Sequence, residues 1–276
     1  MAIISFWSNG KSETGKTTAL AGIATQLSFE NNLKILIINT KHNDISIEDC
    51  FWNTVGTQGK LNFKEAGKTD IDAGIKGLSK AILSNRISPE TVTNYAKTIF
   101  KNRLELLTDT EVSEKEYDER RPLFKEMIKM ANKYYDLVFV DLEGDANDKV
   151  ILEILEISTI IVTTVSQSLR GLNDYVELKK ENKILTESNT MLLVGRYDKK
   201  SKYNLKNVAR YTGEKKTYGI PYSTLYFESC TEGKIPDYFL KFRKAKPTEN
   251  NGLIIESARE FSKDLIENLR MLNENI

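Results

Sequence analysis

Two adjoining stretches decide the fold of this chain: Ala2-Ile-Ile-Ser-Phe-Trp7 and, directly after it, Ser8-Asn-Gly-Lys-Ser-Glu-Thr-Gly-Lys-Thr-Thr18. The first is apolar enough to form a buried strand. After the second, apolar residues recur at helical spacing, at Leu20, Ile23, Ala24 and Leu27. The loop between them fits the P-loop pattern Gly10-x4-Gly15-Lys16-Thr17, which requires a strand before it and a helix after it. The sequence therefore predicts a phosphate-binding loop.

The predicted loop would hold a polyphosphate with backbone N–H groups and the N-terminus of the following helix. Gly10 and Gly15 let the backbone bend, Lys16 would reach the β- and γ-phosphates, and the Thr17 hydroxyl would ligate Mg²⁺. Thr18 would donate to an α-phosphate oxygen. We assign the whole loop to nucleotide binding: Gly10, Lys11, Ser12, Glu13, Thr14, Gly15, Lys16, Thr17 and Thr18.

A second apolar stretch, Tyr135-Asp-Leu-Val-Phe-Val-Asp141, has the form of a Walker B strand that ends in a carboxylate. Because Mg²⁺ keeps several waters and takes one or two carboxylates, we expect Asp141 to hold the ion through water. Glu143 follows two residues later and is a candidate for orienting the attacking water. Thr17 and Asp141 are thus the expected metal residues, and Lys16 and Glu143 are expected to be catalytic.

Composition narrows the class of protein. The 276 residues suffice for one large α/β domain, residues 1–276, and the 40 basic and 39 acidic residues leave a net charge of only +1. Cys50 and Cys230 have neither the number nor the spacing of a disulfide scaffold or zinc site, and His42 is the only histidine. No apolar run is long enough to span a membrane. We expect a soluble, cytoplasmic protein.

Short β-rich runs alternate with helical stretches, which predicts a mostly parallel, twisted sheet with helices on both faces, the three-layer α/β fold of P-loop NTPases. Residues 64–103 and 113–134 are expected to be helical. The last helix, about Leu253 to Leu272, mixes both charge signs on its polar face, which favours packing on the core over a membrane surface. The remaining expected strands are Leu33–Ile38, Leu104–Leu107, Leu137–Asp141, Thr159–Val165, Met191–Val194 and Tyr222–Phe227.

These residues resemble the deviant Walker A ATPases, the ParA/MinD family that positions plasmids, chromosomes and other cargo. The resemblance rests on Lys11 at the start of Lys11-Ser-Glu-Thr-Gly-Lys-Thr17, where the family has its signature lysine. It implies that Lys11 crosses an ATP-sandwiched homodimer to contact the partner's phosphates, like an arginine finger. It also implies that Pro221, in Ile220-Pro-Tyr-Ser223, lies near the adenine.

Several positions depart from the family. Ser12 and Glu13 replace a glycine pair in the loop, and Gly195 stands where an asparagine often reads the adenine. The segment Asn39-Thr-Lys41 stands where the family has Asp-x-Asp, whose carboxylates help to bind Mg²⁺ and to position water. Either hydrolysis is slow or lost, or Asp44 or Glu143 substitutes.

The leading hypothesis is a positioning ATPase whose ATP-bound homodimer binds non-specific DNA, segregates a plasmid or mobile element, and is released by a partner protein that stimulates hydrolysis. The alternative is a nucleotide-dependent switch that hydrolyses little ATP and docks on a protein or a membrane. The charge pattern of the last helix favours the protein over the membrane. A metabolic P-loop ligase is a third hypothesis. Two basic clusters suit phosphate contacts: Lys199, Lys200, Lys202, Lys206 and Arg210, and Lys241, Arg243, Lys244 and Lys246.

Overall fold

The computed structural model describes residues 1–9, 14–42, 47–53, 73–84, 87–109 and 113–274. Within this part of the chain, one eight-stranded sheet has the order β3-β4-β2-β5-β1-β6-β7-β8. All neighbouring strands run parallel except β3, which pairs antiparallel with β4. The strands are β1 (Ala2–Asn9), β2 (Ile35–Asn39), β3 (Lys97–Phe100), β4 (Leu104–Leu107), β5 (Leu137–Gly144), β6 (Ile160–Val165), β7 (Thr190–Tyr197) and β8 (Thr217–Pro221).

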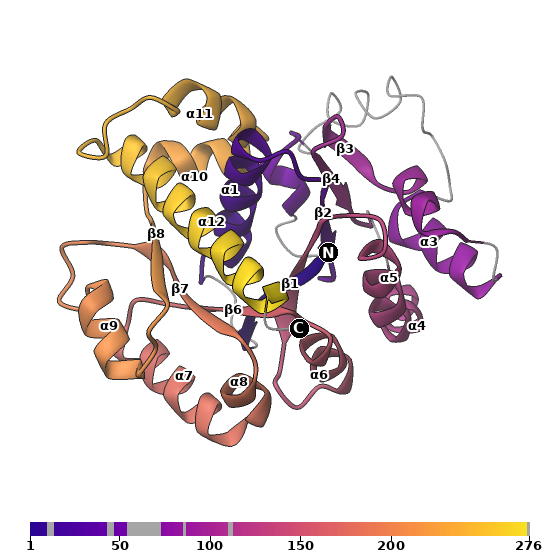
Figure 1. Cartoon of the computed structure of the whole chain (residues 1–276), viewed down its shortest axis with the longest axis horizontal. Coiled ribbons are helices and arrows are strands. Elements are labelled where there is room, and N and C mark those ends of the chain that lie inside the picture. Colours follow the sequence, from indigo (N-terminus) through magenta and orange to yellow (C-terminus); the bar gives the residue numbers. More distant parts are fainter. Residues whose placement is uncertain (10–13, 43–46, 54–72, 85–86, 110–112, 275–276) are drawn as a thin grey trace.

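Helices cover both faces of the sheet (Figure 1). Successive side chains of a strand point to opposite faces, so Phe6 packs in one buried cluster and Trp7 in the other. The Phe6 face carries η1 (Ile47–Cys50), α1 (Lys16–Glu30), α10 (Thr224–Thr231), α11 (Ile235–Phe242) and α12 (Asn250–Glu274). The other face carries η2 (Pro89–Asn94), η3 (Arg121–Leu123), α3 (Gly74–Leu83), α4 (Glu114–Arg120), α5 (Phe124–Ala131), α6 (Lys149–Glu156), α7 (Leu169–Glu181), α8 (Lys183–Glu187) and α9 (Leu205–Thr212).

The central strand β1 lies between β5 and β6, and its residues are buried along nearly their whole length. A parallel strand covered by helices on both faces is expected to be apolar throughout rather than alternating. In open sheets of this kind, ligands bind beyond the carboxyl ends of the strands where the strand order switches. The topology therefore places a site after β1, β5 and β2.

The predicted fold class is confirmed, because the sheet is mostly parallel and has helices on both faces. The prediction for the last helix also holds: Ile254, Phe261 and Leu265 of α12 are fully buried against the sheet. In the described part of the chain, no helix is both long and apolar enough to cross a membrane.

Two predicted elements are wrong. The stretch Tyr222–Phe227 is not a strand: β8 ends at Pro221, and the Ser223 side chain accepts from the Tyr226 N–H and begins helix α10. The helical prediction for residues 64–103 fails at Lys97–Phe100, which forms edge strand β3 by pairing with β4, while 64–72 and 85–86 of this range lie outside the described residues. In both places a cap or a strand partner outweighs the local pattern.

Candidate functional site

The described end of the segment between β1 and α1, Thr14 and Gly15, follows the carboxyl end of the central strand. Gly15 has a φ of 78°, a left-handed conformation that suits glycine, and it stands directly before the first residue of α1, Lys16. The first N–H groups of α1 have no partner within the helix and can bind an anion. Of the predicted nucleotide residues, Gly10, Lys11, Ser12 and Glu13 lie outside the described residues, and so does Asp44, the possible substitute for the missing carboxylate.

The side chain of Lys16 is buried at the end of β5. Its Nζ donates to the Leu142 carbonyl oxygen at 2.6 Å and lies 2.7 Å from Asp141 Oδ1. Burial lowers the pKa of Lys16 below its usual value, while the charge of Asp141 opposes that shift. The ammonium is therefore positioned beside the loop by groups that belong to a different strand.

Thr17 and Asp141, the two predicted metal residues, are in contact. The Thr17 hydroxyl donates to Asp141 Oδ2 at 2.9 Å, and the carboxylate is completely buried. Burial alone would raise the pKa of Asp141, but the charges of Lys16 and Lys41 outweigh it and hold the pKa below its usual value. Asp141 is thus an ionised carboxylate that needs neighbouring cations.

Lys41 supplies the second of these cations. Its Nζ donates to Thr17 Oγ1 at 2.9 Å, lies 2.9 Å from Glu143 Oε2, and is 3.8 Å from Asp141 Oδ2. The resemblance to the ParA/MinD family placed Lys41 where that family has a carboxylate, but it did not indicate that the ammonium points into the site. Its place near the site could have been inferred from the sequence, because Lys41 follows shortly after β2. In the sheet, Asn39 of β2 pairs with Asp141.

The oxygens that would hold Mg²⁺ therefore surround an ammonium group. Since the Thr17 hydroxyl gives its proton to Asp141, its lone pairs are left for a cation, and Lys41 Nζ occupies that direction. Two like unit charges 4 Å apart repel by roughly 4 kcal/mol near a protein surface, and a divalent ion doubles this figure. In this arrangement the donor set does not fit a divalent cation. The described residues also contain no cluster of three His, Cys, Asp or Glu side chains able to bind a metal.

The end of β7 packs against the loop. A Cβ on Gly195 would lie 1.9 Å from the Thr14 carbonyl oxygen, so only glycine allows this approach. Arg196 follows with a positive φ of 50°, and its guanidinium carbon lies 5.8 Å from the centre of the Phe227 ring. Pro221 is buried and pairs with Tyr197 at the ends of β8 and β7. A glycine inside a strand pattern often marks such a close approach of another backbone. The position of Gly195 within an apolar strand was therefore the sequence feature that could have predicted this contact.

A cavity of about 270 Å³ opens next to the loop, beyond the ends of β1 and β6. Its lining includes Thr14 and the hydroxyls of Ser8, Thr163 and Thr164. These three hydroxyls are buried and have no hydrogen-bond partner among the described residues. Because buried polar groups normally have partners, they are available to a ligand.

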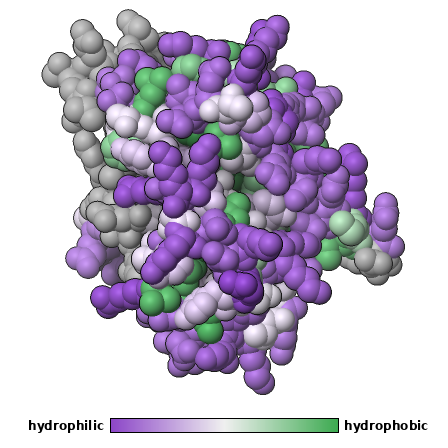
Figure 2. Space-filling model, turned by 90° about the vertical axis from the view of Figure 1, so that its left-hand side faces the viewer, coloured by the Kyte–Doolittle hydropathy of each residue, from purple (hydrophilic) through white to green (hydrophobic). Residues whose placement is uncertain are grey.

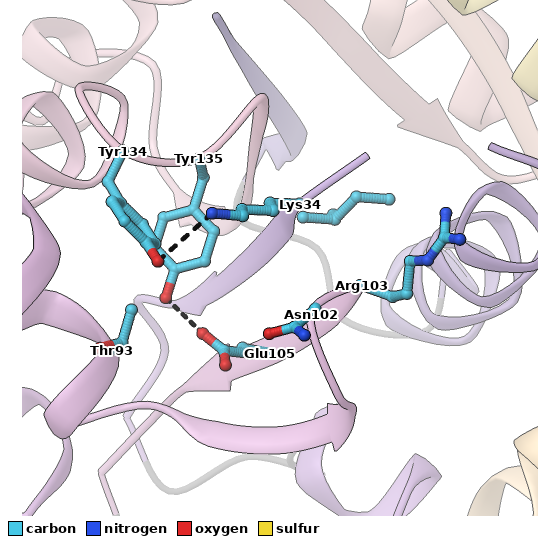
Figure 3. A pocket seen from close by; sticks show the side chains of 8 residues that line it. Lys34, Thr93, Asn102, Arg103, Glu105, Tyr134 and Tyr135 are labelled. Carbon is cyan, nitrogen blue, oxygen red and sulfur yellow. Dashed lines mark hydrogen bonds between the residues drawn. The ribbon is translucent and has the colours of Figure 1, made fainter. Parts of the chain in front are cut away.

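A second pocket lies at the opposite edge of the sheet, where β2, β4 and β5 begin (Figure 3). Tyr135 donates to Glu105 at 2.5 Å across this pocket, and Lys34 donates to Tyr134 at 3.4 Å. Burial, followed by this hydrogen bond, raises the pKa of Tyr135. The cavity holds about 20 Å³, enough for a water molecule but not for a substrate.

The fold and the site define the class: an α/β protein with a P-loop between the central strand and its first helix. No family model and no curated protein matches the chain. Among solved structures, it is similar to a ParA family ATPase from Chlorobium tepidum, with 18% identity, a TM-score of 0.70, and coverage of 95% of this chain and 98% of that chain.

The chain is also similar to the septum site-determining protein MinD from Pyrococcus horikoshii complexed with Mg-ADP, with 19% identity, a TM-score of 0.64, and coverage of 97% and 98%. A putative plasmid partition protein from Borrelia burgdorferi, bound to AMPPNP, matches at 18% identity and a TM-score of 0.54 over 87% of this chain and 98% of that chain. This chain therefore has the fold of the ParA and MinD ATPases, as the motifs predicted.

Proposed function

We propose that this protein binds ATP at the loop and acts as an ATP-dependent positioning switch in the cytoplasm. The observation that carries the proposal is the convergence of Lys16, Thr17 and Asp141 at the carboxyl ends of β1 and β5. Proteins of the same fold have been solved with Mg-ADP and with AMPPNP. The unpartnered hydroxyls of the adjoining cavity add further donors for a bound phosphate.

In this proposal ATP closes a homodimer, and Lys11 of each protomer contacts the phosphates held by the other. The argument for the dimer is the lysine-containing loop sequence together with the fold. A MinC:MinD complex from Aquifex aeolicus, a further protein of this fold, supports a partner protein as the regulator of turnover.

Non-specific DNA is our proposed surface for the dimer. Lys199, Lys200, Lys202, Lys206 and Arg210, the α9 cluster, are all exposed on α9 and the turn before it. Figure 2, which looks onto the left-hand side of Figure 1, shows a mostly hydrophilic surface whose apolar residues form small separate groups. Exposed lysines and arginines bind phosphates without regard to sequence. On this face of the molecule, the same hydrophilic character argues against insertion into a membrane.

The arrangement around Lys41 favours a second candidate, a switch with little turnover. The family's second-strand carboxylates are replaced by Asn39 and Lys41, and Glu143 is paired with Lys41 at 2.9 Å. In this arrangement the Glu143 carboxylate faces the Lys41 ammonium, which stands where the attacking water would have to be held. Such a protein would bind ATP and dimerise, and DNA would leave its slow hydrolysis unchanged.

Co-sedimentation with DNA tests the proposal, using ATP, ADP or no nucleotide at low and moderate salt. We expect binding with ATP only, with a steep loss as salt rises. A variant in which Lys199, Lys200 and Lys202 are changed to Glu should no longer bind DNA but should still bind ATP. Equal absence of DNA binding under all three nucleotide conditions would move the assignment to a protein-docking switch. Failure to bind ATP would refute both.

A further inference from the structure

We propose that the Lys41 ammonium is a built-in cation that takes the place of the divalent ion in the phosphate site, so that ATP binds without Mg²⁺. The inference rests on the proposed ATP-binding function and deepens it. It contradicts the expectation that Thr17 and Asp141 hold Mg²⁺, and it follows from the ammonium group that lies beside both of them.

The contacts of Lys41 are those that a cation in the site would make. Its Nζ lies 2.9 Å from both Thr17 Oγ1 and Glu143 Oε2 and 3.8 Å from Asp141 Oδ2. Hydroxyl and carboxylate oxygens are the ligands that Mg²⁺ prefers. A lysine ammonium is a compact point charge with three donors, so it can satisfy the same oxygens with hydrogen bonds.

The backbone leading to Lys41 is fixed to the same strand as the site. The Thr40 hydroxyl donates to the Asp141 carbonyl oxygen at 2.9 Å, and the Tyr117 hydroxyl donates to the Thr40 carbonyl oxygen at 2.8 Å. The Lys41 N–H donates to Asn39 Oδ1 at 3.2 Å, and the Lys41 side chain is only 9% exposed. The ammonium is therefore delivered to the site by the fold, rather than reaching it from a freely rotating surface side chain.

Among the described residues of the site, two positive and two negative charges pair with one another. Lys16 and Lys41 carry the two positive charges, and Asp141 and Glu143 carry the two negative charges. A divalent ion next to Thr17 would lie beside an ammonium in a buried setting, where like charges repel strongly. Removing the Lys41 charge would leave one uncompensated carboxylate and three oxygens open to a cation.

The test is to measure the affinity for a fluorescent ATP analogue in EDTA and in excess MgCl₂. For the wild type we expect the two dissociation constants to agree within about threefold. Lys41→Met, which keeps most of the side chain's volume without its charge, should bind weakly in EDTA and tighten by about tenfold or more with Mg²⁺. Lys125→Ala, which removes a lysine paired with Glu153 on the outer helices, should behave like the wild type.

A second measurement uses Mn²⁺ alone, followed by electron paramagnetic resonance, with no nucleotide. The wild type should leave the signal of free Mn²⁺ unchanged, whereas Lys41→Met and Lys41→Ala should reduce it by binding the ion. Two lysine variants are used so that a folding defect in one, detected by thermal denaturation, does not decide the result.

The outcomes separate this inference from the proposed function. If the wild type binds the ATP analogue only with Mg²⁺, or binds Mn²⁺ by itself, Lys41 does not replace the ion, and the ATP-binding function stands. If the wild type binds no ATP analogue in either buffer, the proposed function fails and the inference falls with it.

Discussion

Gly195 and Lys41 show what single residues contribute to this site. The P-loop pattern and the strand-end aspartate were enough to predict that Lys16, Thr17 and Asp141 belong to one site, because parallel strands end at the same edge of a sheet. The role of Lys41 was not predictable, since sequence spacing does not give the direction of a long side chain. The close approach of Gly195 to the loop depends on a contact between distant parts of the chain.

Gly195→Ala should displace the loop and weaken ATP binding. The added Cβ would lie 1.9 Å from the Thr14 carbonyl oxygen, so the loop backbone must move. We expect the affinity for ATP to fall by about tenfold or more, corresponding to about 1.4 kcal/mol, measured by calorimetric titration. Gly213→Ala is the control, because its φ of 73° strains alanine but a Cβ there meets nothing within 4 Å. It should lower stability and leave ATP affinity unchanged.

Lys16→Ala should abolish ATP binding and leave the protein folded. The substitution removes the cation that would reach the phosphates, and contacts of this charged kind contribute about 1.5–3 kcal/mol each. Lys41 stays 3.8 Å from Asp141 Oδ2 and continues to neutralise it. Equilibrium binding should show no bound ATP at concentrations that saturate the wild type, a loss of about 100-fold or more, with a normal circular dichroism spectrum. Tight binding by this variant would mean that the phosphates lie elsewhere.

At the scale of helices and strands, the best-predicted elements are those whose own residues carry a clear pattern of apolar and polar positions. The apolar face of α12 was predictable from the helical spacing of its apolar residues, and β2 and β5 were predictable from their apolar runs. All three elements are buried in the structure. Edge strand β3 was missed because its pairing with β4 is a tertiary contact. The β-branched and aromatic run that follows β8 was misread because the Ser223 cap begins a helix there.

The start of α6 provides a test of a single helix. Asp148 accepts from the N–H groups of Val150 and Ile151 and forms an ion pair with Arg121. Burial raises the pKa of Asp148, but Arg121 and the two N–H groups outweigh it and hold the pKa below its usual value. Asp148→Ala should therefore lower the free energy of unfolding at pH 7 by about 1–2 kcal/mol.

The pH dependence of this effect has a definite sign. Because the folded pKa lies below the unfolded value of 3.8, the stabilisation is complete above that value and disappears as the pH falls through the folded pKa. Urea denaturation at pH 7 and near pH 3 should show the gap between wild type and Asp148→Ala narrowing. Asp148→Asn keeps a capping oxygen without a charge, so it should cost less than alanine and change little with pH.

At the scale of the whole molecule, the fold was predictable because several independent features of the sequence indicate the same architecture. These features are the apolar strands, the helical stretches between them, and a loop that stands between a strand and a helix. Its likeness to ParA and MinD structures extends over most of the chain at less than 20% identity. What the fold does not specify is the surface on which a dimer would act. That property belongs to exposed side chains, which a fold tolerates in many combinations.

Dimerisation is the prediction that belongs to this scale. Lys11→Ala should bind ATP as a monomer with wild-type affinity but fail to dimerise, because the removed charge is expected to act across the dimer. Sedimentation velocity with ATP should show a dimer for the wild type and a monomer for the variant, and Lys16→Ala should remain monomeric because it binds no ATP. A normal ATP-dependent dimer of Lys11→Ala would remove the main argument for the deviant Walker A mechanism.

The order of strands in the sheet also governs how the chain is made. Strand β1 is synthesised before the other strands of the sheet, yet Ala2 pairs with Leu137 and Ile4 pairs with Ile160. At about 5–20 residues per second, translation reaches these partners roughly 7–30 s after β1 has been synthesised. During that interval the central strand of the sheet, which is buried along nearly its whole length, has no neighbour on either side. A nascent chain of this protein therefore depends on chaperones or on temporary collapse with α1 until its middle third has emerged.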